Sequence, residues 1–410
     1  MTHGSATRLI AEIGTLPPRL RHELDAIRRA GGCSRVELHQ ALGLRPATVT
    51  HDTARLLRLG LIQSGRASGR AQGRPRLPLE IDARSWQALG VSIEPGIVRV
   101  QAVDLNGQPL APVLQRRAHG AQGLLGETRH LLQQMLGDQI LAIGLAVPGF
   151  VEPRSLHVLF SAAWPQAGPI DLAPLQDLAA PRRIILDNST NTLACRVQFE
   201  RPVVDGQDQL LIYFADGRLG ASLLAAGRPV AGCICGANEL GHNRLPVPTP
   251  RCYCGRTGCL ERIFSRQFLQ AQDGRRQDLG ASLMDPARRP AVDRMSDLLA
   301  VGLANALNFC RVGRVIWAID LPGTEPYFRA LARQVRGQLL RELRQRVEIS
   351  LLTQTGPCGP RDAATLALTQ VCFQPDGPGP ALARPAASRT RTTAALHAVR
   401  DRPRHEAEAR

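Results

Sequence analysis

A short cysteine-rich loop constrains the fold of this chain more than any other stretch of its sequence. The segment GHNRLPVPTPRCYCGRTGCLER, residues 241–262, places Cys252, Cys254 and Cys259 within eight positions, with His242 ten residues before the first of them. Zinc prefers four tetrahedral nitrogen and sulfur ligands, and a Cys-x-Cys-x4-Cys loop can supply three. The alternative is a cluster of buried or surface thiols, which is less favourable because exposed thiols this close together oxidise readily.

Length and composition indicate an ordinary globular protein. With 410 residues the chain is longer than one typical domain, so we expect two or three domains. We find no apolar run that approaches the length of a membrane span, and the start MTHGSATRLI lacks the apolar core of a secretory signal. We therefore expect a cytoplasmic protein with no membrane partner. In that reducing compartment the ten cysteines are expected to be thiols or metal ligands rather than disulfides.

The basic residues of the chain point to a polyanionic partner. The formal net charge is +16, and because the sequence contains no lysine, all 51 basic residues are arginine. Arginine binds phosphate groups bidentately and releases the counterions condensed on nucleic acids. Residues 1–80 hold 13 arginines against six acidic residues, so the N-terminal region is the expected contact surface.

The sequence of residues 34–59 is typical of a helix-turn-helix. Ser34 followed by Glu37 is a capping box that opens a short helix, and Gly43 closes it. Pro46 suits the first turn of a second helix, which we expect to run to about Leu59 and to enter a major groove. The residues predicted to point outward from this second helix are Ala47, Thr48, Thr50, His51 and Thr53.

Residues 60–82 have the pattern of the wing of a winged helix. The segment GLIQSGRASGRAQGRPRLPLEID predicts a strand, a loop rich in glycine and arginine, and a returning strand. The alternative is a solvated basic hairpin beside an ordinary helical pair; double-stranded DNA is the favoured partner because helix pattern, hairpin and charge agree. The loop arginines expected to contact phosphates or a minor groove are Arg66, Arg70, Arg74 and Arg76.

After residue 85 the pattern changes to alternating strands and helices. We predict a hairpin within residues 86–110, a helix over 124–137, and strands within 140–152 and 182–188. A helix over 191–200 and two strands within 209–230 follow, and this alternation predicts an α/β domain. The predicted domains are a winged helix-turn-helix with an N-terminal extension over 1–82, an effector-binding α/β domain over 83–372, and a disordered tail rich in Arg, Pro and Ala over 373–410.

The order of the motifs resembles the ROK family (repressor, open reading frame, kinase), which groups sugar-responsive repressors with sugar kinases. VDLNG, GLAVPGFVE, DNSTN, GRLGASLLAAG, ELGH and CYCGRTGCLE follow the winged helix in that order, and the last two are the most specific. The resemblance covers roughly residues 33–372 and implies a bilobal, actin-like domain with a sugar cleft. It also implies that His242 completes a zinc site with the three loop cysteines. That zinc would be structural, because a filled shell leaves no position for water. A competing pair, Cys233 and Cys235, has no role in the family pattern.

The resemblance also implies a set of sugar-binding residues. Positions matching Glu239, His242 and Glu261 bind sugar hydroxyls in the family, and Asn188 is kept beside them. A carboxylate suits this task because it accepts bidentate hydrogen bonds from adjacent hydroxyls. For either glutamate alone, an ordinary surface charge is the alternative.

Two departures from the family's kinases predict that the chain is not an enzyme. Kinases carry Asn-Asp where this sequence has Asn188-Ser189, and serine is a poor general base. Asp187 lies one position early on a strand end, so its side chain is expected to point the other way. SIEPG, residues 92–96, replaces the kinases' Asp-x-Gly-Gly-Thr phosphate loop.

These features together favour a DNA-binding repressor of carbohydrate metabolism. We expect it to respond to a sugar or sugar derivative and to act as a homodimer or homotetramer. The alternatives are an active ATP-dependent sugar kinase with an appended DNA-binding domain, and a regulator that has lost its ligand.

Overall fold

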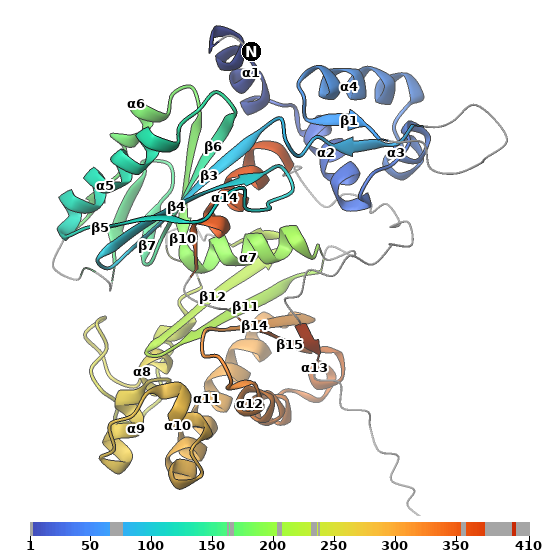
Figure 1. Cartoon of the computed structure of the whole chain (residues 1–410). Helices are drawn as coiled ribbons and strands as arrows, with labels where there is room; N and C mark the ends of the chain where they lie inside the picture. Colours follow the sequence, from blue (N-terminus) through green and yellow to red (C-terminus); the bar gives the residue numbers. More distant parts are fainter. Residues whose placement is uncertain are drawn as a thin grey trace, which may run out of the picture. The chain divides into compact units, whose positions relative to one another are not determined.

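The computed structural model describes residues 3–65, 77–161, 164, 168–202, 207–230, 236, 238–353 and 358–373, and the backbone of 396–398. The chain divides into two compact units (Figure 1). The first comprises Met1–Gln207, Leu224–Ala237 and Cys358–Thr390, and the second comprises Asp208–Leu223, Asn238–Pro357 and Arg391–Arg410. Strands and helices are mixed in both units, which confirms the predicted α/β class.

The N-terminal region contains the predicted pair of helices and a hairpin. Ser34 and Glu37 form the predicted capping box: the Glu37 N–H donates to Ser34 Oγ at 3.2 Å and the Ser34 N–H donates to Glu37 Oε2 at 2.7 Å. The second helix of the pair begins at Pro46, as predicted. The elements are α1 (His3–Gly14), α2 (Pro18–Ala30), α3 (Arg35–Leu42), α4 (Pro46–Arg58) and the antiparallel strands β1 (Ile62–Ser64) and β2 (Leu79–Ile81). The predicted loop contacts Arg66, Arg70, Arg74 and Arg76 lie outside the described residues.

The first unit is built on a five-stranded sheet in the order β10-β6-β3-β4-β5, covered by helices on both faces (Figure 1). Leu89, Val91 and Ile93 of β3 pack with α5 and α6, whereas the preceding Ala88 points to the other face and belongs to the cluster that contains α7 and α14. This alternation follows from the two-residue period of a strand. The bounds are β3 (Gln87–Glu94), β4 (Ile97–Asp104), β5 (Leu114–Arg117), α5 (Gly120–Met135), β6 (Ile140–Val147), α6 (Leu175–Ala179), β10 (Arg183–Asn188), α7 (Ser189–Glu200) and α14 (Pro360–Leu368).

Helix α14 lies directly against the backbone of the central strands. Gly144 of β6 faces the Ala363 carbonyl, and a Cβ atom at this position would collide with that oxygen. Gly90 of β3 faces the Pro360 carbonyl in the same way. The two glycines therefore explain how a helix from the far end of the chain closes this face of the sheet. A small antiparallel sheet of β7 (Phe150–Glu152), β8 (His157–Phe160) and β9 (Ile170–Asp171) completes the strands of this unit's α/β part.

One hydrophobic cluster joins the N-terminal helices to this α/β part. Leu20, Leu24 and Ile27 of α2 share a buried cluster with Phe199 of α7 and with Phe373. Phe373 ends η3 (Thr369–Phe373), which follows α14. The first unit accordingly continues through residue 82, where the sequence predicts a domain boundary.

Arg28 of α2 adds polar contacts to the same junction. Its guanidinium carbon lies 3.9 Å from the centroid of the Phe199 ring and 5.3 Å from that of Phe373. Its Nη1 also donates to the Phe199 carbonyl at 2.8 Å, while Nε and Nη2 donate to Asp25. Cation–π contacts and charge-assisted hydrogen bonds therefore join α2 to the end of α7.

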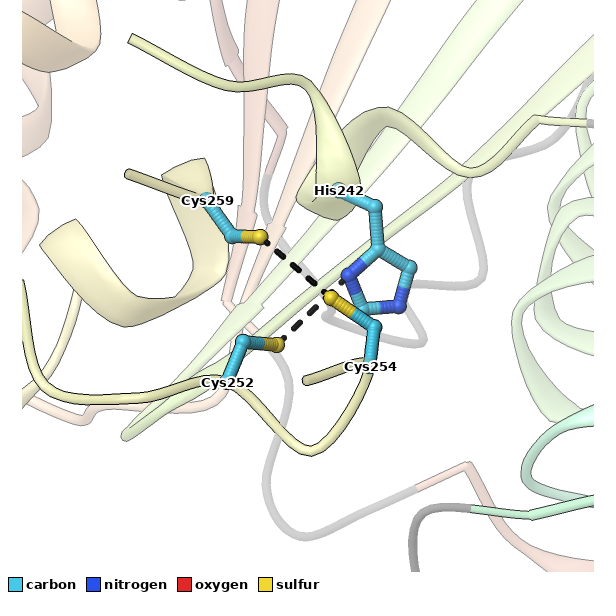
Figure 2. A group of neighbouring side chains, drawn as sticks. All are labelled: His242, Cys252, Cys254 and Cys259. Carbon is cyan, nitrogen blue, oxygen red and sulfur yellow. Dashed lines mark hydrogen bonds between the residues drawn. The ribbon is translucent and has the colours of Figure 1, made fainter. Parts of the chain in front are cut away.

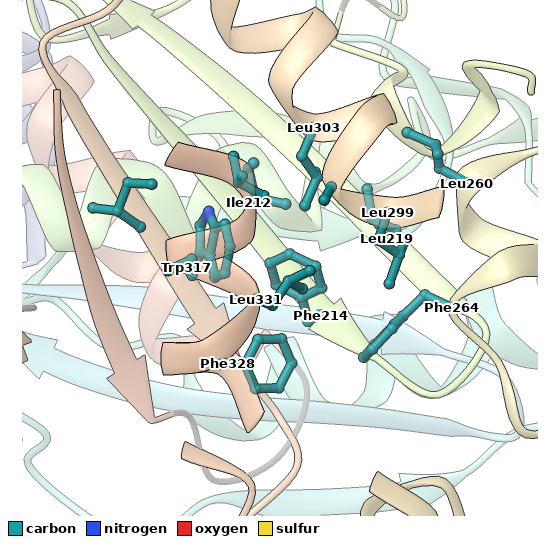
Figure 3. Close-up of a cluster of buried hydrophobic side chains, with 14 of the residues drawn as sticks. Ile212, Phe214, Leu219, Leu260, Phe264, Leu299, Leu303, Trp317, Phe328 and Leu331 are labelled. Carbon is teal, nitrogen blue, oxygen red and sulfur yellow. The ribbon is translucent and has the colours of Figure 1, made fainter. Parts of the chain in front are cut away.

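The second unit has its core between a mixed sheet, in which β11, β14 and β15 run parallel, and a bundle of helices (Figure 3). Phe214 of β11 lies at the centre, with ring centroids 5.3 Å from Phe264, 5.0 Å from Phe328 and 5.3 Å from Trp317. The sheet order is β13-β12-β11-β14-β15-β16. Its strands are β11 (Gln209–Ala215), β12 (Arg218–Ala225), β13 (Arg228–Pro229), β14 (Arg314–Ile319), β15 (Glu348–Thr353) and β16 (Leu396–Ala398), of which β13 and the end of β12 fall in the range Leu224–Ala237 that is counted with the first unit.

Apart from η1, the helices of the second unit follow Cys259 in sequence. They are η1 (Leu240–His242), α8 (Leu260–Ile263), α9 (Arg266–Asp273), α10 (Leu279–Met284), η2 (Pro286–Arg288), α11 (Arg289–Cys310), α12 (Glu325–Gly337) and α13 (Arg341–Arg346). The predicted tail begins at Phe373, which ends η3 and is buried, and β16 within that tail pairs antiparallel with β15; residues 374–395 and 399–410 lie outside the described residues. In the described part of the chain, none of the helices has both the length and the apolar character that crossing a bilayer requires.

Candidate metal and ligand site

The cysteine loop of the second unit is folded by backbone hydrogen bonds into a compact turn. The Cys252 N–H donates to the Arg256 carbonyl at 2.8 Å, and the Gly255 N–H donates back to the Cys252 carbonyl at 2.9 Å. Gly258 has φ of +84°, and a Cβ atom there would collide with the Leu245 carbonyl oxygen. These contacts bring Cys252 and Cys254 back toward Cys259, the N-cap residue of α8.

The structure brings together the four predicted metal ligands (Figure 2). The ligand atoms of His242, Cys252, Cys254 and Cys259 all lie within 4.8 Å of one another. Cys252 Sγ is 3.7 Å from His242 Nδ1, and Cys254 Sγ is 3.6 Å from Cys259 Sγ. Two sulfurs that each lie about 2.3 Å from a tetrahedral zinc would be about 3.8 Å apart, so this donor set fits zinc in both chemistry and spacing.

The imidazole of His242 is in the form that a metal requires. Burial, assisted by the nearby Arg256, lowers the pKa of His242 below its usual value. The neutral ring is the ligand form, and its Nδ1 faces the cysteines. The competing cysteines, Cys233 and Cys235, lie outside the described residues.

Two carboxyl groups lie beside the four ligands. Glu261, in the first turn of α8, is buried, and Glu239 immediately precedes η1. Burial raises the pKa of both carboxyl groups to about 7, and the charge of Glu261 adds to the effect on Glu239. The Cys252 thiol donates to Glu261 Oε1 at 3.6 Å. The same loop therefore holds the metal ligands and two of the predicted sugar-binding carboxyl groups.

Tyr253 is a member of this group that the sequence reasoning missed. Its hydroxyl oxygen lies 2.8 Å from His242 Nε2, and its ring meets the imidazole edge-on. The Cys-x-Cys spacing identifies the two cysteines but says nothing about the residue between them. Only the folded turn places that side chain against His242.

Asn188 belongs to the first unit and has a defined local role. It is the N-cap of α7, where its Oδ1 accepts from the Thr190 N–H at 2.8 Å. Its Nδ2 donates to the Gly149 carbonyl at 2.7 Å. Asp187 accepts from Asn191 Nδ2 and from the Asn188 N–H, and burial raises its pKa. That Asn188 and the predicted sugar-binding residues of the second unit bind the same ligand stays a prediction.

Helix α4 presents part of the predicted DNA-contacting set on its surface. Ala47, Thr50 and His51 are exposed and Thr48 is partly exposed. The prediction that Thr53 points outward is wrong: Thr53 is fully buried, and its hydroxyl accepts from Arg35 Nε at 3.0 Å.

The burial of Thr53 follows from helical spacing. Val49, Thr53 and Leu56 are three and four residues apart, so they lie on one inward face of the helix. The outward face continues instead to Ala54, which is exposed and was not predicted. Ala54 follows Ala47 and Thr50 at the three- and four-residue spacing of a helix face, and this spacing could have identified Ala54 in the sequence.

Comparisons with known proteins agree with the fold. The DNA-binding transcriptional dual regulator NagC of Escherichia coli strain K12 is 25% identical over 250 residues, which are 58% of this chain and 60% of NagC. The N-acetyl-D-glucosamine kinase of Citrobacter koseri is 29% identical over 221 residues, 49% of this chain and 71% of the kinase. The chain thus spans about three fifths of the length of the regulator it matches.

Solved structures and family models extend this likeness. The crystal structure of a ROK family transcriptional regulator, a homologue of the E. coli MLC protein, superposes with a TM-score of 0.73 at 19% identity. That superposition covers 87% of this chain and 97% of the regulator. The model of the ROK family matches residues 98–369, about two thirds of the sequence. The chain therefore belongs to the ROK family.

Proposed function

We propose that the protein is a DNA-binding transcription regulator, a repressor of carbohydrate metabolism, that responds to a sugar or sugar derivative. The observation that carries this proposal is a ROK domain preceded by a helix pair and hairpin whose second helix, α4, has an exposed polar face. The similarity to NagC supports it. The partners would be double-stranded DNA and a sugar effector, and the protein would act as a homodimer or homotetramer.

The DNA-binding part would be a winged helix-turn-helix in which α4 enters the major groove. A bidentate ion pair holds this helix: Arg19 Nε lies 2.6 Å from Asp52 Oδ2, and Arg19 Nη2 lies 3.0 Å from Asp52 Oδ1. Asp52 is buried on α4, and Arg19 belongs to α2. Such a pair fixes geometry as well as charge, so Thr50 and His51 would be presented on a firmly held helix.

The effector would be bound by the carboxyl groups beside the metal loop. Glu239 and Glu261 can accept hydrogen bonds from adjacent sugar hydroxyls. The metal, structural zinc held by His242 and the three cysteines, would supply a cross-link that fixes the loop carrying both glutamates. Regulation then requires that the sugar prefer one arrangement of the DNA-binding parts.

Several local features support a sensor rather than a kinase. Ser189 occupies the position of the kinases' general base and begins α7. The SIEPG segment comprises the end of β3 and the turn into β4, and Glu94 at the end of β3 pairs with Arg99 of β4. The segment thus carries a carboxylate where a phosphate would have to bind. The similarity to an N-acetyl-D-glucosamine kinase keeps an active ATP-dependent sugar kinase as the second candidate.

DNA binding can be tested through the salt dependence of the affinity. The double variant Arg70→Ala/Arg74→Ala should bind all DNA sequences more weakly, and the slope of log affinity against log salt should fall by about 2, because each phosphate contact contributes about 0.9. Thr50→Ala should instead change which bases are preferred. Arg341→Ala/Arg346→Ala, which removes the same charge from exposed positions of α13, is the matched control. Equal slopes for the two double variants would contradict the proposed interface.

Sugar binding and phosphorylation can be separated on one preparation. Calorimetry against hexoses and N-acetylhexosamines should detect a ligand, whereas a coupled assay with ATP should show turnover about 10²- to 10⁴-fold below that of a kinase with its general base. Glu261→Gln should weaken the binding, and Glu342→Gln, at an exposed position of α13, should not. Turnover at an ordinary kinase rate would favour the second candidate, and an absence of binding to any sugar would contradict the sensor.

A further inference from the structure

Tyr253 makes a specific polar contact with a metal ligand. Its hydroxyl oxygen is 2.8 Å from His242 Nε2, within the usual range of a hydrogen bond. The two ring centroids lie 4.9 Å apart at an interplanar angle of 79°. On the opposite side of the imidazole, Nδ1 faces Cys252 Sγ. Nδ1 of His242 thus faces a predicted metal ligand, and Nε2 faces the hydroxyl of Tyr253.

The second nitrogen of a metal-bound histidine needs an acceptor. When a metal occupies Nδ1, the proton of the neutral ring resides on Nε2, and this N–H is nearly always donated to an oxygen that fixes the tautomer and the ring orientation. Two oxygens compete for it here. Tyr253 Oη lies at 2.8 Å, whereas Glu239 Oε2 lies at 3.7 Å, too far for a good hydrogen bond. Distance therefore selects the tyrosine.

We propose that Tyr253 is the positioning residue of the metal group: its hydroxyl oxygen accepts the His242 Nε2–H, orients Nδ1 toward the metal and leaves Glu239 free for the effector. This inference rests on the zinc and sugar sites proposed above. It also assigns different roles to neighbouring side chains. Because Nε2 is occupied by Tyr253, the proposal assigns the hydrogen bonds to sugar hydroxyls on this side of the site to Glu239 and Glu261, and it departs here from the prediction that His242 also binds them.

The position of Tyr253 agrees with such a role. The residue is 38% exposed and does not belong to the buried cluster of the second unit, so packing in that core does not set its orientation. The edge-on contact with His242 and the hydrogen bond of the hydroxyl group are directional interactions that fix the orientation of the phenol relative to the imidazole. Removal of the hydroxyl alone should therefore affect the metal group more than the core.

The test compares Tyr253→Phe with the wild type in the full chain. Zinc affinity is measured by competition with a chelating dye, and the geometry of the site by the visible absorption spectrum of the Co²⁺-substituted protein. We expect a 10- to 100-fold lower zinc affinity, the usual effect of losing an outer hydrogen-bond partner, and an altered Co²⁺ spectrum. Tyr213→Phe is the matched control, because it removes a phenol that donates to Asp320 at 2.8 Å in the same unit.

Each outcome bears on a separate claim. Unchanged zinc affinity and an unchanged Co²⁺ spectrum in Tyr253→Phe would overturn the role of Tyr253 while leaving the zinc site intact. A wild-type protein that binds no zinc would overturn both. Glu239→Gln compares the two acceptors directly: we expect it to lower zinc affinity less than Tyr253→Phe does, and the reverse order would identify Glu239 as the acceptor.

Discussion

Cys254→Ser is expected to abolish stoichiometric zinc binding and to weaken the response to sugar. The wild type should carry about one zinc per chain, held by four ligands. Cys254 is exposed, so the change to serine removes a thiolate ligand with little effect on packing. Structural zinc contributes roughly 10–16 kcal/mol of binding free energy in small zinc domains, so loss of one ligand should be among the largest single effects available here. Elemental analysis and sugar calorimetry on the same sample measure both consequences.

Cys310→Ser provides the control for this experiment. Cys310 is a free, partly exposed thiol in the last turn of α11, and it is not one of the four clustered ligands. The Cys310→Ser variant should retain the zinc content and the sugar affinity of the wild type. Zinc content that is equal in the two serine variants would exclude the proposed ligand set. Loss of zinc from Cys254→Ser with unchanged sugar binding would show that the loop does not depend on the metal for its shape.

Glu23→Gln is expected to stabilise the protein at neutral pH. Glu23 lies on α2 and is fully buried, and its protonated carboxyl can donate a hydrogen bond to the carboxylate of Asp52. Burial, together with the neighbouring carboxyl of Asp52, raises the pKa of Glu23 to about 9. A folded chain at pH 7 therefore keeps Glu23 protonated, and the amide of glutamine reproduces this neutral state.

The pH dependence of this effect has a definite sign. Below pH 4.5 both the folded and the unfolded wild type hold the Glu23 proton, so the variant gains nothing. Between 4.5 and about 9 the unfolded state ionises while the folded state does not, and the wild type loses about 1.4 kcal/mol for each pH unit. The variant should therefore be more stable by about 3 kcal/mol at pH 7.

Urea unfolding between pH 4 and pH 8 measures this difference, with Glu342→Gln on the surface of α13 as the control. The gap between Glu23→Gln and the wild type should widen as the pH rises, while the gap for the control stays flat. A constant difference, or a destabilised Glu23→Gln at every pH, would mean that Glu23 is ionised in the folded protein.

Features fixed by nearby residues were predictable from the sequence. The capping box of Ser34 and Glu37 and the helix start at Pro46 depend on interactions within a few residues, and all appear in the structure. Helix α2 has equally local signals, Pro18 at its start and Gly31 in a left-handed conformation at its end, although the sequence reasoning treated this region only as an extension. The three cysteines of the candidate metal group were predicted from their spacing on one loop, and His242 was added by the resemblance to the ROK family; the structure brings all four together.

Features that depend on the tertiary fold were not predictable in the same way. Tyr253 meets His242 only after the loop closes, and Asn188 bonds to Gly149 only because β10 and β6 are neighbours. The burial of the Glu23 carboxyl beside Asp52 of α4 could likewise not be predicted from a helix rich in charged residues, since nothing in the local pattern marks that position as enclosed. In each of these cases the partner comes from another segment of the chain.

The contacts of Arg28 have a consequence for any exchange of the N-terminal region with that of another protein. A recombination point at residue 82 looks natural in the sequence, but it would separate Arg28 from Phe199 and Phe373, and α2 from half of its shared cluster. An N-terminal region taken from another protein would need a cation and an apolar surface that match the end of α7 and η3. The N-terminal helices and the C-terminal segment after α14 would therefore have to be exchanged together, although more than 300 residues separate them in the sequence.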